Sequence, residues 1–292
     1  MLTNFAVNTE CGNRYQPRRC AITSAPAGRF FVWAVLFLCA LFALDQPATA
    51  AGESVPVACH ANAYDEKAVV KHVIDGDTVI LADDRHIRLI GINTPEIGHD
   101  GHASQPGAEE AHNYLNNLLH TNKTIRLHYD RERFDHYGRT LAHLFLQDGT
   151  NIQALLLDRG LATTLTMPPN LEFVDCYQIG TANAQTHGIG LWALKQYQPT
   201  PAELITREDL GYRIINGNVI RIANGKSAVW IDLGGNLSLH IAREDQQYFV
   251  NLRKLAGKQI RASGLLYLSN GEFRMRIRHP VDLKIINVTN GN

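Results

Sequence analysis

Short runs of apolar and β-branched residues, bounded by turn residues, predict five strands in the first half of the chain. They are residues 68–74, 78–81, 86–90, 124–129 and 140–146. The pair Asp75-Gly76 ends the first run, which predicts a tight bend there. Asp83-Asp84 separates the second run from the third, which predicts a hairpin.

Apolar residues at helical spacing predict a helix that follows the third strand. They are Ala108, Ala111, Leu115, Leu118 and Leu119, with Pro106 in the first turn. Two further helices are predicted at residues 151–159 and 172–186. Five strands with a helix after the third is the element order of an OB-type barrel.

The second half of the chain repeats this order. Strands are predicted at residues 217–222, 228–233, 237–241, 259–266 and 273–278, and a helix is predicted at 244–255. We therefore expect an α+β protein, in which an OB-fold-like β-barrel with helices precedes a smaller, degenerate OB-like domain.

These patterns divide the chain into five parts. We expect a signal peptide or N-terminal anchor at 1–50, a tail at 51–66, the first barrel domain at 67–197, a linker at 198–211 and the OB-like domain at 212–288. The apolar run at 30–44 is shorter than the roughly 20 residues that span a bilayer. Because Ala48-Thr49-Ala50 is typical of a cleavage site, a secretory signal is favoured, with an uncleaved anchor as the alternative.

Cysteine usage agrees with export to the periplasm or the medium. Two cysteines follow the leader, Cys59 and Cys176, and an even pair in an oxidising compartment favours a disulfide. The alternatives are two unpaired thiols or a lipid anchor on Cys59. A membrane is expected as a partner only if the leader stays uncleaved.

Charge is unevenly distributed, although the whole chain has a formal net charge of +0. Residues 51–198 hold 11 Lys+Arg against 18 Asp+Glu, a net of −7, and residues 199–292 hold 13 against 8, a net of +5. An acidic half that could hold a metal ion is thus followed by a basic half that could hold phosphate.

Several motifs combine carboxylates with arginines. They are Asp75-Gly76-Asp77, Arg88, Asn93-Thr94-Pro95-Glu96 and Asp135-His136-Tyr137-Gly138-Arg139. Carboxylate oxygens bind hard cations such as calcium, and guanidinium groups grip phosphate in bidentate fashion. Asp75 and Asp77 alone could form a solvated turn, Glu96 an N-cap or surface carboxylate, and Arg88 a local ion pair.

In order and spacing, these motifs, together with Gly190-Leu191-Trp192, resemble the staphylococcal nuclease (thermonuclease) family from about residue 69 to 192. The resemblance implies a barrel that binds one Ca²⁺ ion and hydrolyses DNA and RNA to fragments ending in 3′-phosphates. Single strands or a loosened duplex are the expected substrates, and no stable protein partner is implied.

The resemblance also implies a role for each motif residue. Asp77 and the carbonyl of Thr94 would bind the calcium ion, with Asp75 in its outer shell. Glu96 would act as the general base, and Arg88 and Arg139 would clamp the phosphate.

Tyr137 matches a family position that hydrogen-bonds a phosphate. Asn93 stands where the family has a second acidic ligand, so weaker calcium binding is expected. Residues 161–168 lack the tyrosines that the family's type member offers for nucleotide stacking, which leaves base preference open.

Two questions stay open at this point. Arg274, Arg276 and Arg278 alternate along one strand and therefore share a face, which is either a phosphate-binding stripe or a solvated outer face. The chain as a whole is predicted to be a calcium-dependent, exported endonuclease. The alternative is a catalytically weakened module that only docks nucleic acid or protein, and Asn93 is the main argument for it.

Overall fold

The computed structural model describes residues 59–286 except residue 99, and these residues belong to one compact unit. The expected leader at 1–50 and most of the expected tail lie outside the described residues. Within the described part, no helix is long and apolar enough to cross a membrane.

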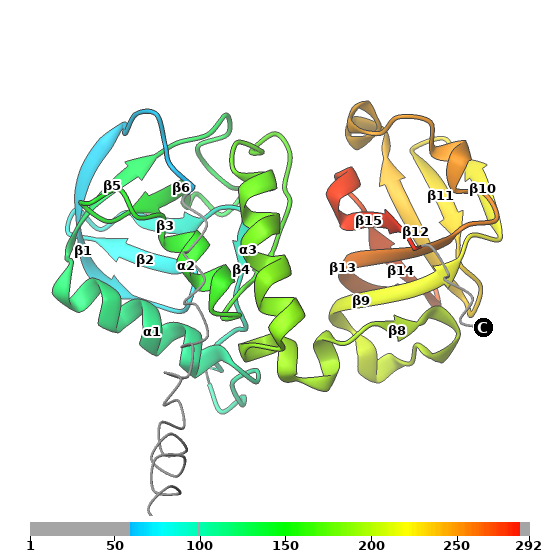
Figure 1. Ribbon diagram of the computed structural model, residues 1–292, viewed down its shortest axis with the longest axis horizontal. Helices are drawn as coiled ribbons and strands as arrows, with labels where there is room; N and C mark the ends of the chain where they lie inside the picture. Colours follow the sequence, from blue (N-terminus) through cyan, green and yellow to red (C-terminus); the bar gives the residue numbers. More distant parts are fainter. Residues whose placement is uncertain (1–58, 99, 287–292) are drawn as a thin grey trace, which may run out of the picture. The chain divides into compact units, whose positions relative to one another are not determined.

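The first half of the described chain forms a closed five-stranded barrel (Figure 1). Its strands are β1 (Glu66–Val73), β2 (Thr78–Leu81), β3 (His86–Leu89), β5 (Thr124–His128) and β6 (Thr140–Phe145). Their order around the barrel is β1-β2-β3-β6-β5, and β3 and β6 run parallel whereas the other neighbours run antiparallel. The predicted OB-type barrel is confirmed.

Alternation along the strands decides which side chains fill the barrel. In β3, Ile87 and Leu89 have no exposed surface. Successive side chains of a strand point to opposite faces, so Arg88, which lies between them, is on the outer face. The register of β3 places Arg88 beside Thr78 of β2 and Leu141 of β6.

Three α-helices cover the barrel: α1 (Ala108–Thr121), α2 (Ile152–Asp158) and α3 (Val174–His187). The Asn151 side chain caps α2 by accepting a hydrogen bond from the Ala154 N–H. Gly107, in the left-handed conformation with φ 92°, precedes α1. Pro106 therefore lies just outside α1, and its predicted place in the first turn was wrong.

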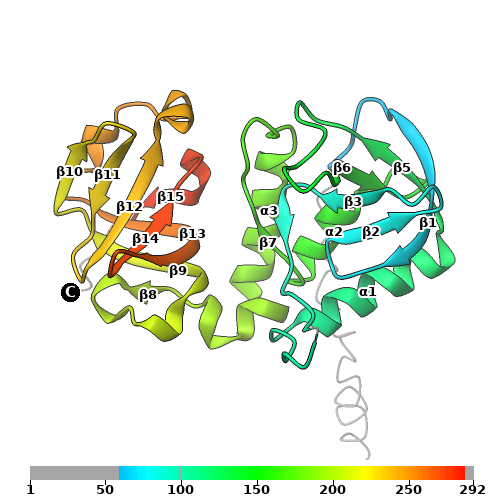
Figure 2. The same ribbon diagram turned by 180° about the vertical axis from the view of Figure 1, so that it is seen from behind.

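A two-residue strand pair joins the loop after β3 to the segment after α2. It consists of β4 (Ile92–Asn93), labelled in Figure 1, and β7 (Thr163–Thr164), labelled in Figure 2. Asn93 lies opposite Thr163 in this pair. The sequence pattern gave no signal for so short a pair. Its consequence is that Asn93 is held by strand pairing.

The second half of the described chain forms an eight-stranded sheet. Its strands are β8 (Thr200–Pro201), β9 (Gly211–Asn218), β10 (Arg221–Asn224), β11 (Ala228–Asp232), β12 (Leu237–Ala242), β13 (Gln259–Ser269), β14 (Glu272–Arg276) and β15 (Leu283–Ile285). Like β3 and β6, β12 and β14 are parallel. If β9 and β10 are counted as one interrupted strand, the order β10-β11-β12-β14-β13-β9 repeats that of the barrel.

Two predicted elements of this half were wrong. The predicted strand at 217–222 is broken at residues 219–220, between β9 and β10. In place of the predicted helix at 244–255 there are two 3₁₀ helices, η5 (Arg243–Tyr248) and η6 (Leu252–Leu255). Asn251 separates them in the left-handed conformation, with φ 53°.

The other 3₁₀ helices are η1 (Gly190–Ala193), η2 (Lys195–Tyr197), η3 (Ala202–Leu204), η4 (Arg207–Asp209) and η7 (Pro280–Asp282). The segment expected as a linker thus holds β8, η3 and η4, and β8 pairs with β9.

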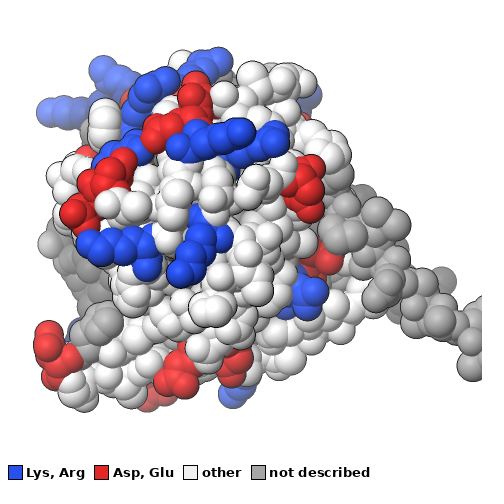
Figure 3. All heavy atoms as spheres, turned by 90° about the vertical axis from the view of Figure 1, so that its left-hand side faces the viewer, with Lys and Arg blue, Asp and Glu red and all other residues white. Residues whose placement is uncertain are grey.

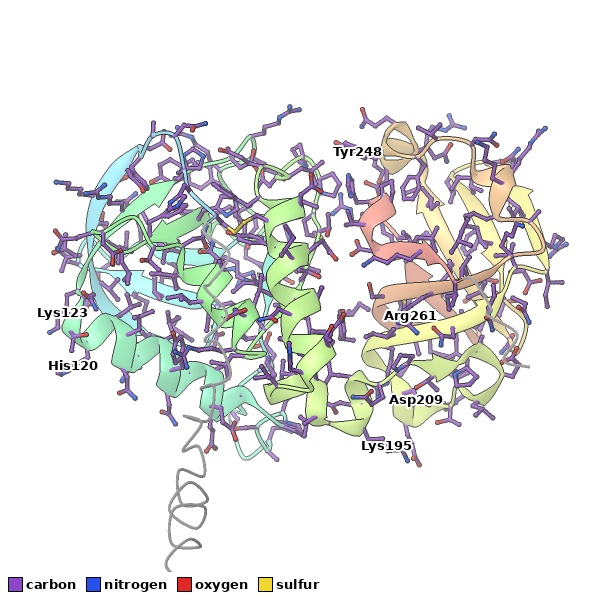
Figure 4. All side chains as sticks on the ribbon, in the orientation of Figure 1. His120, Lys123, Lys195, Asp209, Tyr248 and Arg261 are labelled. Atoms are coloured by element: carbon purple, nitrogen blue, oxygen red, sulfur yellow. A yellow bond between two sulfur atoms is a disulfide. The ribbon has the colours of Figure 1, made fainter. Side chains whose placement is uncertain are left out.

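A disulfide joins Cys59 to Cys176 of α3, drawn as a yellow bond in Figure 4. The predicted pairing is confirmed, and the unpaired-thiol and lipid-anchor alternatives fail. The two cysteines are 117 residues apart. In the loop-entropy model, closing so long a loop raises the free energy of the unfolded chain by roughly 4–5 kcal/mol and stabilises the folded state by the same amount.

Candidate active site

Asp77 is a buried carboxylate at the end of the bend between β1 and β2, with 2% of its surface exposed. One oxygen accepts hydrogen bonds from the Thr94 N–H at 2.7 Å, and the other accepts one from the Thr78 hydroxyl at 3.1 Å. Burial, together with the negative charges of Asp75 and Glu96, raises the pKa of Asp77 to about 6, against the lowering effect of Arg88. Even beside Arg88, the Asp77 carboxylate is thus harder to ionise than an ordinary aspartate, and a further cation would favour its charged form.

Arg88 connects the barrel wall to this carboxylate. Its Nη2 lies 3.1 Å from Asp77 Oδ2 and donates to the Ile92 carbonyl at 3.0 Å and to Asn93 Oδ1 at 3.2 Å. Its Nη1 donates to the Leu89 carbonyl at 2.6 Å. A guanidinium with 11% side-chain exposure needs such partners, and these fix its position before any ligand arrives.

Asn93, at the end of β4, and Thr94, which follows it, supply two neutral oxygens next to the Arg88–Asp77 pair. The Asn93 amide donates to the Thr94 carbonyl at 3.1 Å, while its own oxygen faces Arg88. The Asn93 carbonyl accepts a hydrogen bond from the Thr163 hydroxyl at 3.3 Å. Thr94 is 2% exposed, and its backbone is held by two hydrogen bonds, because its N–H donates to Asp77 and its carbonyl accepts from the Asn93 amide.

Gly76 allows this loop to approach the bend. A Cβ at position 76 would lie 2.7 Å from the Cβ of Ala111 and 2.7 Å from Cγ2 of Thr94. Real Cβ atoms do not come so close to other carbons, so the bend, α1 and the Thr94 loop fit together only around a glycine. The glycine thus sets the distance between Asp77 and Thr94.

Glu96 is exposed, and within the described residues its carboxylate makes no hydrogen bond or ion pair. Its backbone is held instead, since its N–H donates to Gln105 Oε1 at 3.1 Å and its carbonyl accepts from the Gln105 N–H at 2.9 Å. The negative charge of Glu96 contributes to the raised pKa of Asp77, so the two carboxylates are close enough to interact. Glu96 is therefore an accessible carboxylate on a braced loop.

Asp135 organises the loop that carries Arg139. One of its oxygens accepts the backbone N–H groups of Tyr137 and Arg139, each at 2.9 Å, and the other accepts the Arg139 Nε–H at 2.7 Å. These bonds hold the pKa of Asp135 below its usual value despite partial burial. Tyr137 is 74% exposed, and its ring lies 3.7 Å from that of His136 and 5.6 Å from the Arg139 guanidinium.

The β3–β6 register relates Arg139 to Arg88. Thr140 lies opposite Ile87, and Leu141 opposite Arg88. Arg139 immediately precedes this pairing, and neighbouring strands are about 4.8 Å apart. The two arginines are therefore attached to adjacent strands, and no described contact joins their side chains directly.

Within the described residues, no group of three or more His, Cys, Asp or Glu side chains could by itself hold a metal ion. The oxygens nonetheless fit a hard cation, because calcium also accepts carbonyl and amide oxygens. Around Asp77, three carboxylates (Asp75, Asp77 and Glu96) face one guanidinium, that of Arg88. A divalent cation held by Asp77, Asn93 and the Thr94 carbonyl would balance this excess of two negative charges.

Three contacts of the site were not predicted from the sequence. They are the hydrogen bond from the Thr78 hydroxyl to Asp77, the hydrogen bond from the Thr163 hydroxyl to the Asn93 carbonyl, and the ion pair of Asp135 with Arg139. Only Asp135 had a signal, because an aspartate four residues before an arginine across a turn is well placed for an ion pair. Thr78 directly follows Asp77, so its contact is local, whereas Thr163 is far from Asn93 in the sequence and only the fold brings the two together.

Comparison with known proteins bears on this site. The chain is 38% identical over 130 residues to the thermonuclease of Staphylococcus intermedius, a stretch that is 44% of this chain and 76% of the relative. Residues 86–194 match the family described as Staphylococcal nuclease homologue. The chain belongs to the staphylococcal nuclease family.

Two further relatives agree. The thermonuclease of Staphylococcus hyicus is 33% identical over 136 residues, covering 46% of this chain and 79% of the relative. Endonuclease YncB of Bacillus subtilis is 30% identical over 129 residues, covering 42% of this chain and 60% of the relative. This member of the staphylococcal nuclease family is therefore a hydrolytic nuclease.

The arginine stripe of the second half forms internal ion pairs. Arg276 lies 2.6 Å from Asp245 and 2.7 Å from Glu244, and Arg278 lies 3.4 Å from Asp245. Arg274 lies 3.0 Å from Glu272. The stripe is therefore not a freely solvated face, and a phosphate would have to compete with Glu244, Asp245 and Glu272 for these arginines.

Charge pairing also marks the barrel face that lies at the left of Figure 1. Figure 3 shows blue Lys and Arg beside red Asp and Glu on this face. Lys71 pairs with Asp84 at 2.6 Å, and Arg85 pairs with Asp83 at 2.8 Å and also with Glu66. A polyanion therefore meets mixed charges there.

Proposed function

We propose that this nuclease is a calcium-dependent endonuclease that hydrolyses DNA and RNA and leaves 3′-phosphates. The observation that carries the proposal is the connected network of Asp77, Arg88, Asn93 and Thr94 around one buried carboxylate. Glu96 adds an accessible carboxylate whose charge reaches this network.

Each residue has a distinct task in the proposed reaction. Asp77, Asn93 and the Thr94 carbonyl hold the cation, and Asp75 orients Asp77 by accepting its N–H at 3.0 Å. Bound calcium supplies a Lewis acid that polarises a phosphoryl oxygen. Glu96 accepts a proton from the water that attacks phosphorus in line. A bond forms between the water oxygen and phosphorus, the bond from phosphorus to the 5′-oxygen breaks, and the 5′-oxygen leaves as a hydroxyl after taking a proton from solvent.

The arginines and Tyr137 bind the phosphate. Arg88 and Arg139 oppose the charge that develops on the phosphoryl oxygens in the transition state. Arg139 must exchange its contact with Asp135 for one with the phosphate, or share it. Tyr137 is exposed beside Arg139, from where its hydroxyl can donate to a phosphate oxygen.

Digestion of plasmid DNA and of RNA, with calcium and with a chelator, tests the proposal directly. We expect cleavage only with calcium, and fragments that a 3′-phosphatase converts to 3′-hydroxyl ends. Equal cleavage in the presence of the chelator would exclude the metal role.

The second candidate is a catalytically weakened family member that mainly docks nucleic acid or protein, and Asn93 in place of a second acidic ligand favours it. Binding without cleavage at saturating calcium would support this candidate instead.

We also propose export to the periplasm or the medium. The disulfide between Cys59 and Cys176 supports this, because such bonds persist in oxidising compartments. Fractionation of the producing cell tests it. Export predicts a disulfide-bonded protein outside the cytoplasm, and a chain that remains reduced in the cytoplasm would contradict it.

A further inference from the structure

A groove of about 720 Å³ lies in the second half of the chain, between β10 and the segment that holds η5 and η6. Tyr248, labelled in Figure 4, is the last residue of η5. The apolar part of the lining comes mainly from Ile222, Val229, Phe249 and Leu252. The volume is within the range of sites that bind small molecules or short segments of a polymer.

Among the described residues, the charged ones that line this groove are Arg221 and Arg253, and none is acidic. Asp232 approaches Arg221 only at 4.0 Å, with the Arg221 side chain 74% exposed, so this contact is weak. Within the described residues, no acidic side chain forms an ion pair with Arg253. Unlike the arginines of β14, these two are available to an external anion.

The groove is also open along one strand edge. β10 ends the strand order of the sheet. In the part of the chain that the structure describes, β11 is its one strand partner, so the other edge of β10 is unpaired there. Ile220, at the start of the groove, is 68% exposed, and Val250, beside Phe249, is 93% exposed. Exposed apolar side chains beside a cationic groove are typical of a binding surface.

We propose that this groove binds single-stranded nucleic acid, as a second contact for the substrate of the proposed nuclease. Arg221 and Arg253 contact phosphates, and Phe249 with the neighbouring apolar side chains receives a base. Asn224 and Asn251, which also line the groove, offer amide groups to base edges. Charge complementarity decides between occupants, because a groove with two cations and no acid fits a polyanion better than a neutral peptide.

This proposal rests on the proposed function and deepens it. A strand held at two places dissociates more slowly than one held at the catalytic site alone. We therefore expect the groove to lower KM for long single strands and to leave kcat unchanged. A dinucleotide substrate is too short to occupy both places and should be cleaved equally with or without the two arginines.

The test compares two double variants of the oxidised, full-length protein. Arg221→Gln with Arg253→Gln removes the groove cations. Arg207→Gln with Lys254→Gln removes the same charge from exposed positions that do not line the groove, and Lys254 is on the same 3₁₀ turn as Arg253. Binding of a labelled oligothymidylate is followed by fluorescence anisotropy at several salt concentrations, with chelator present and the strand checked for integrity.

Each phosphate contact with a single strand contributes about 0.7 to the slope of log K against log salt. The groove variant should lose about 1.4 of this slope, and the control variant should keep the slope of the parent. Equal slopes in all three proteins, or equal losses in both variants, would overturn the proposal. Binding of a peptide that the groove variant alone loses, with unchanged nucleic-acid slopes, would also overturn it.

Binding and cleavage are measured separately, so the two proposals can fail separately. A groove-dependent slope in a protein that cuts nothing would exclude the proposed function and support the groove. Calcium-dependent cleavage, together with a salt dependence of binding that does not change when Arg221 and Arg253 are replaced, would support the proposed function and exclude nucleic-acid binding by the groove.

Discussion

Replacing Asn93 by aspartate tests the cation site most sharply. Asn93 Oδ1 and Asp77 Oδ2 lie 3.2 and 3.1 Å from the same Arg88 nitrogen, so they are at most about 6.3 Å apart. At an effective dielectric of about 20, a second negative charge at this distance repels the first by about 3 kcal/mol. Arg88 contacts both groups and offsets this repulsion in the metal-free protein, which should therefore still fold.

Calcium bound between the two carboxylates would remove the repulsion. The expected gain is about 1.4–3 kcal/mol, which lowers the Kd for calcium roughly 10- to 150-fold. Isothermal titration calorimetry of the parent and of Asn93→Asp measures the difference. Asn218→Asp, at an exposed position in β9, changes the net charge equally and serves as the control.

An unchanged Kd in Asn93→Asp would refute the assignment of position 93 as a calcium ligand. An equal gain in calcium affinity in Asn218→Asp would show that the gain comes from net charge alone and not from a ligand at position 93. Cleavage rates at subsaturating calcium should rise in Asn93→Asp and stay level in the control.

Three further outcomes are expected. Glu96→Gln should lower kcat by roughly 10²–10⁴-fold and largely keep the calcium affinity, because it removes the proposed base. Single-turnover cleavage measures this rate, and wild-type turnover would contradict the role of Glu96 in the mechanism. Gly76→Ala should cost about 1–3 kcal/mol of unfolding free energy, since its Cβ would meet Ala111 and Thr94 at 2.7 Å; an unshifted urea midpoint would contradict the packing argument. Burial lowers the pKa of His143 to about 3, below its ordinary value of 6.5, so the unfolded chain binds a proton that the folded chain does not. The free energy of unfolding should therefore fall below about pH 6.5, by up to roughly 1.4 kcal/mol per pH unit. Urea unfolding of His143→Gln at pH 4.5 and 6.5 should show a smaller loss of unfolding free energy than the parent, and equal losses would exclude His143 as the cause.

The barrel could be predicted because its strands alternate strongly and its turns carry diagnostic residues. The predicted hairpin at Asp83-Asp84 is present, and Asp84 adopts the left-handed conformation in its turn, with φ 67°. The pair β4–β7 could not be predicted, because two residues are too few to show a period. For the same reason Asn93 could be recognised as a motif position but not as a residue held by Thr163.

The errors in the second half have local physical causes. Residues 244–255 carry apolar positions at helical spacing, yet Asn251 turns left-handed and divides the segment into two short 3₁₀ turns. The arginines at 274, 276 and 278 do alternate as predicted. Glu244 and Asp245, the partners of Arg276 and Arg278, lie about thirty residues earlier, and only the fold brings them together. Sequence spacing shows which residues share a face, but it does not show what that face meets.

The covalent link between Cys59 and Cys176 makes the folded population depend on its surroundings. In the loop-entropy model, the reduced chain has a free energy of unfolding that is lower by roughly 4–5 kcal/mol. That is a large part of the 5–15 kcal/mol that typically separates a native domain from its unfolded state. A newly made chain in a reducing cytosol would therefore spend more time unfolded than the same chain after oxidation. Its ability to cut the nucleic acids of the cell that made it would be held back until the two sulfurs had joined.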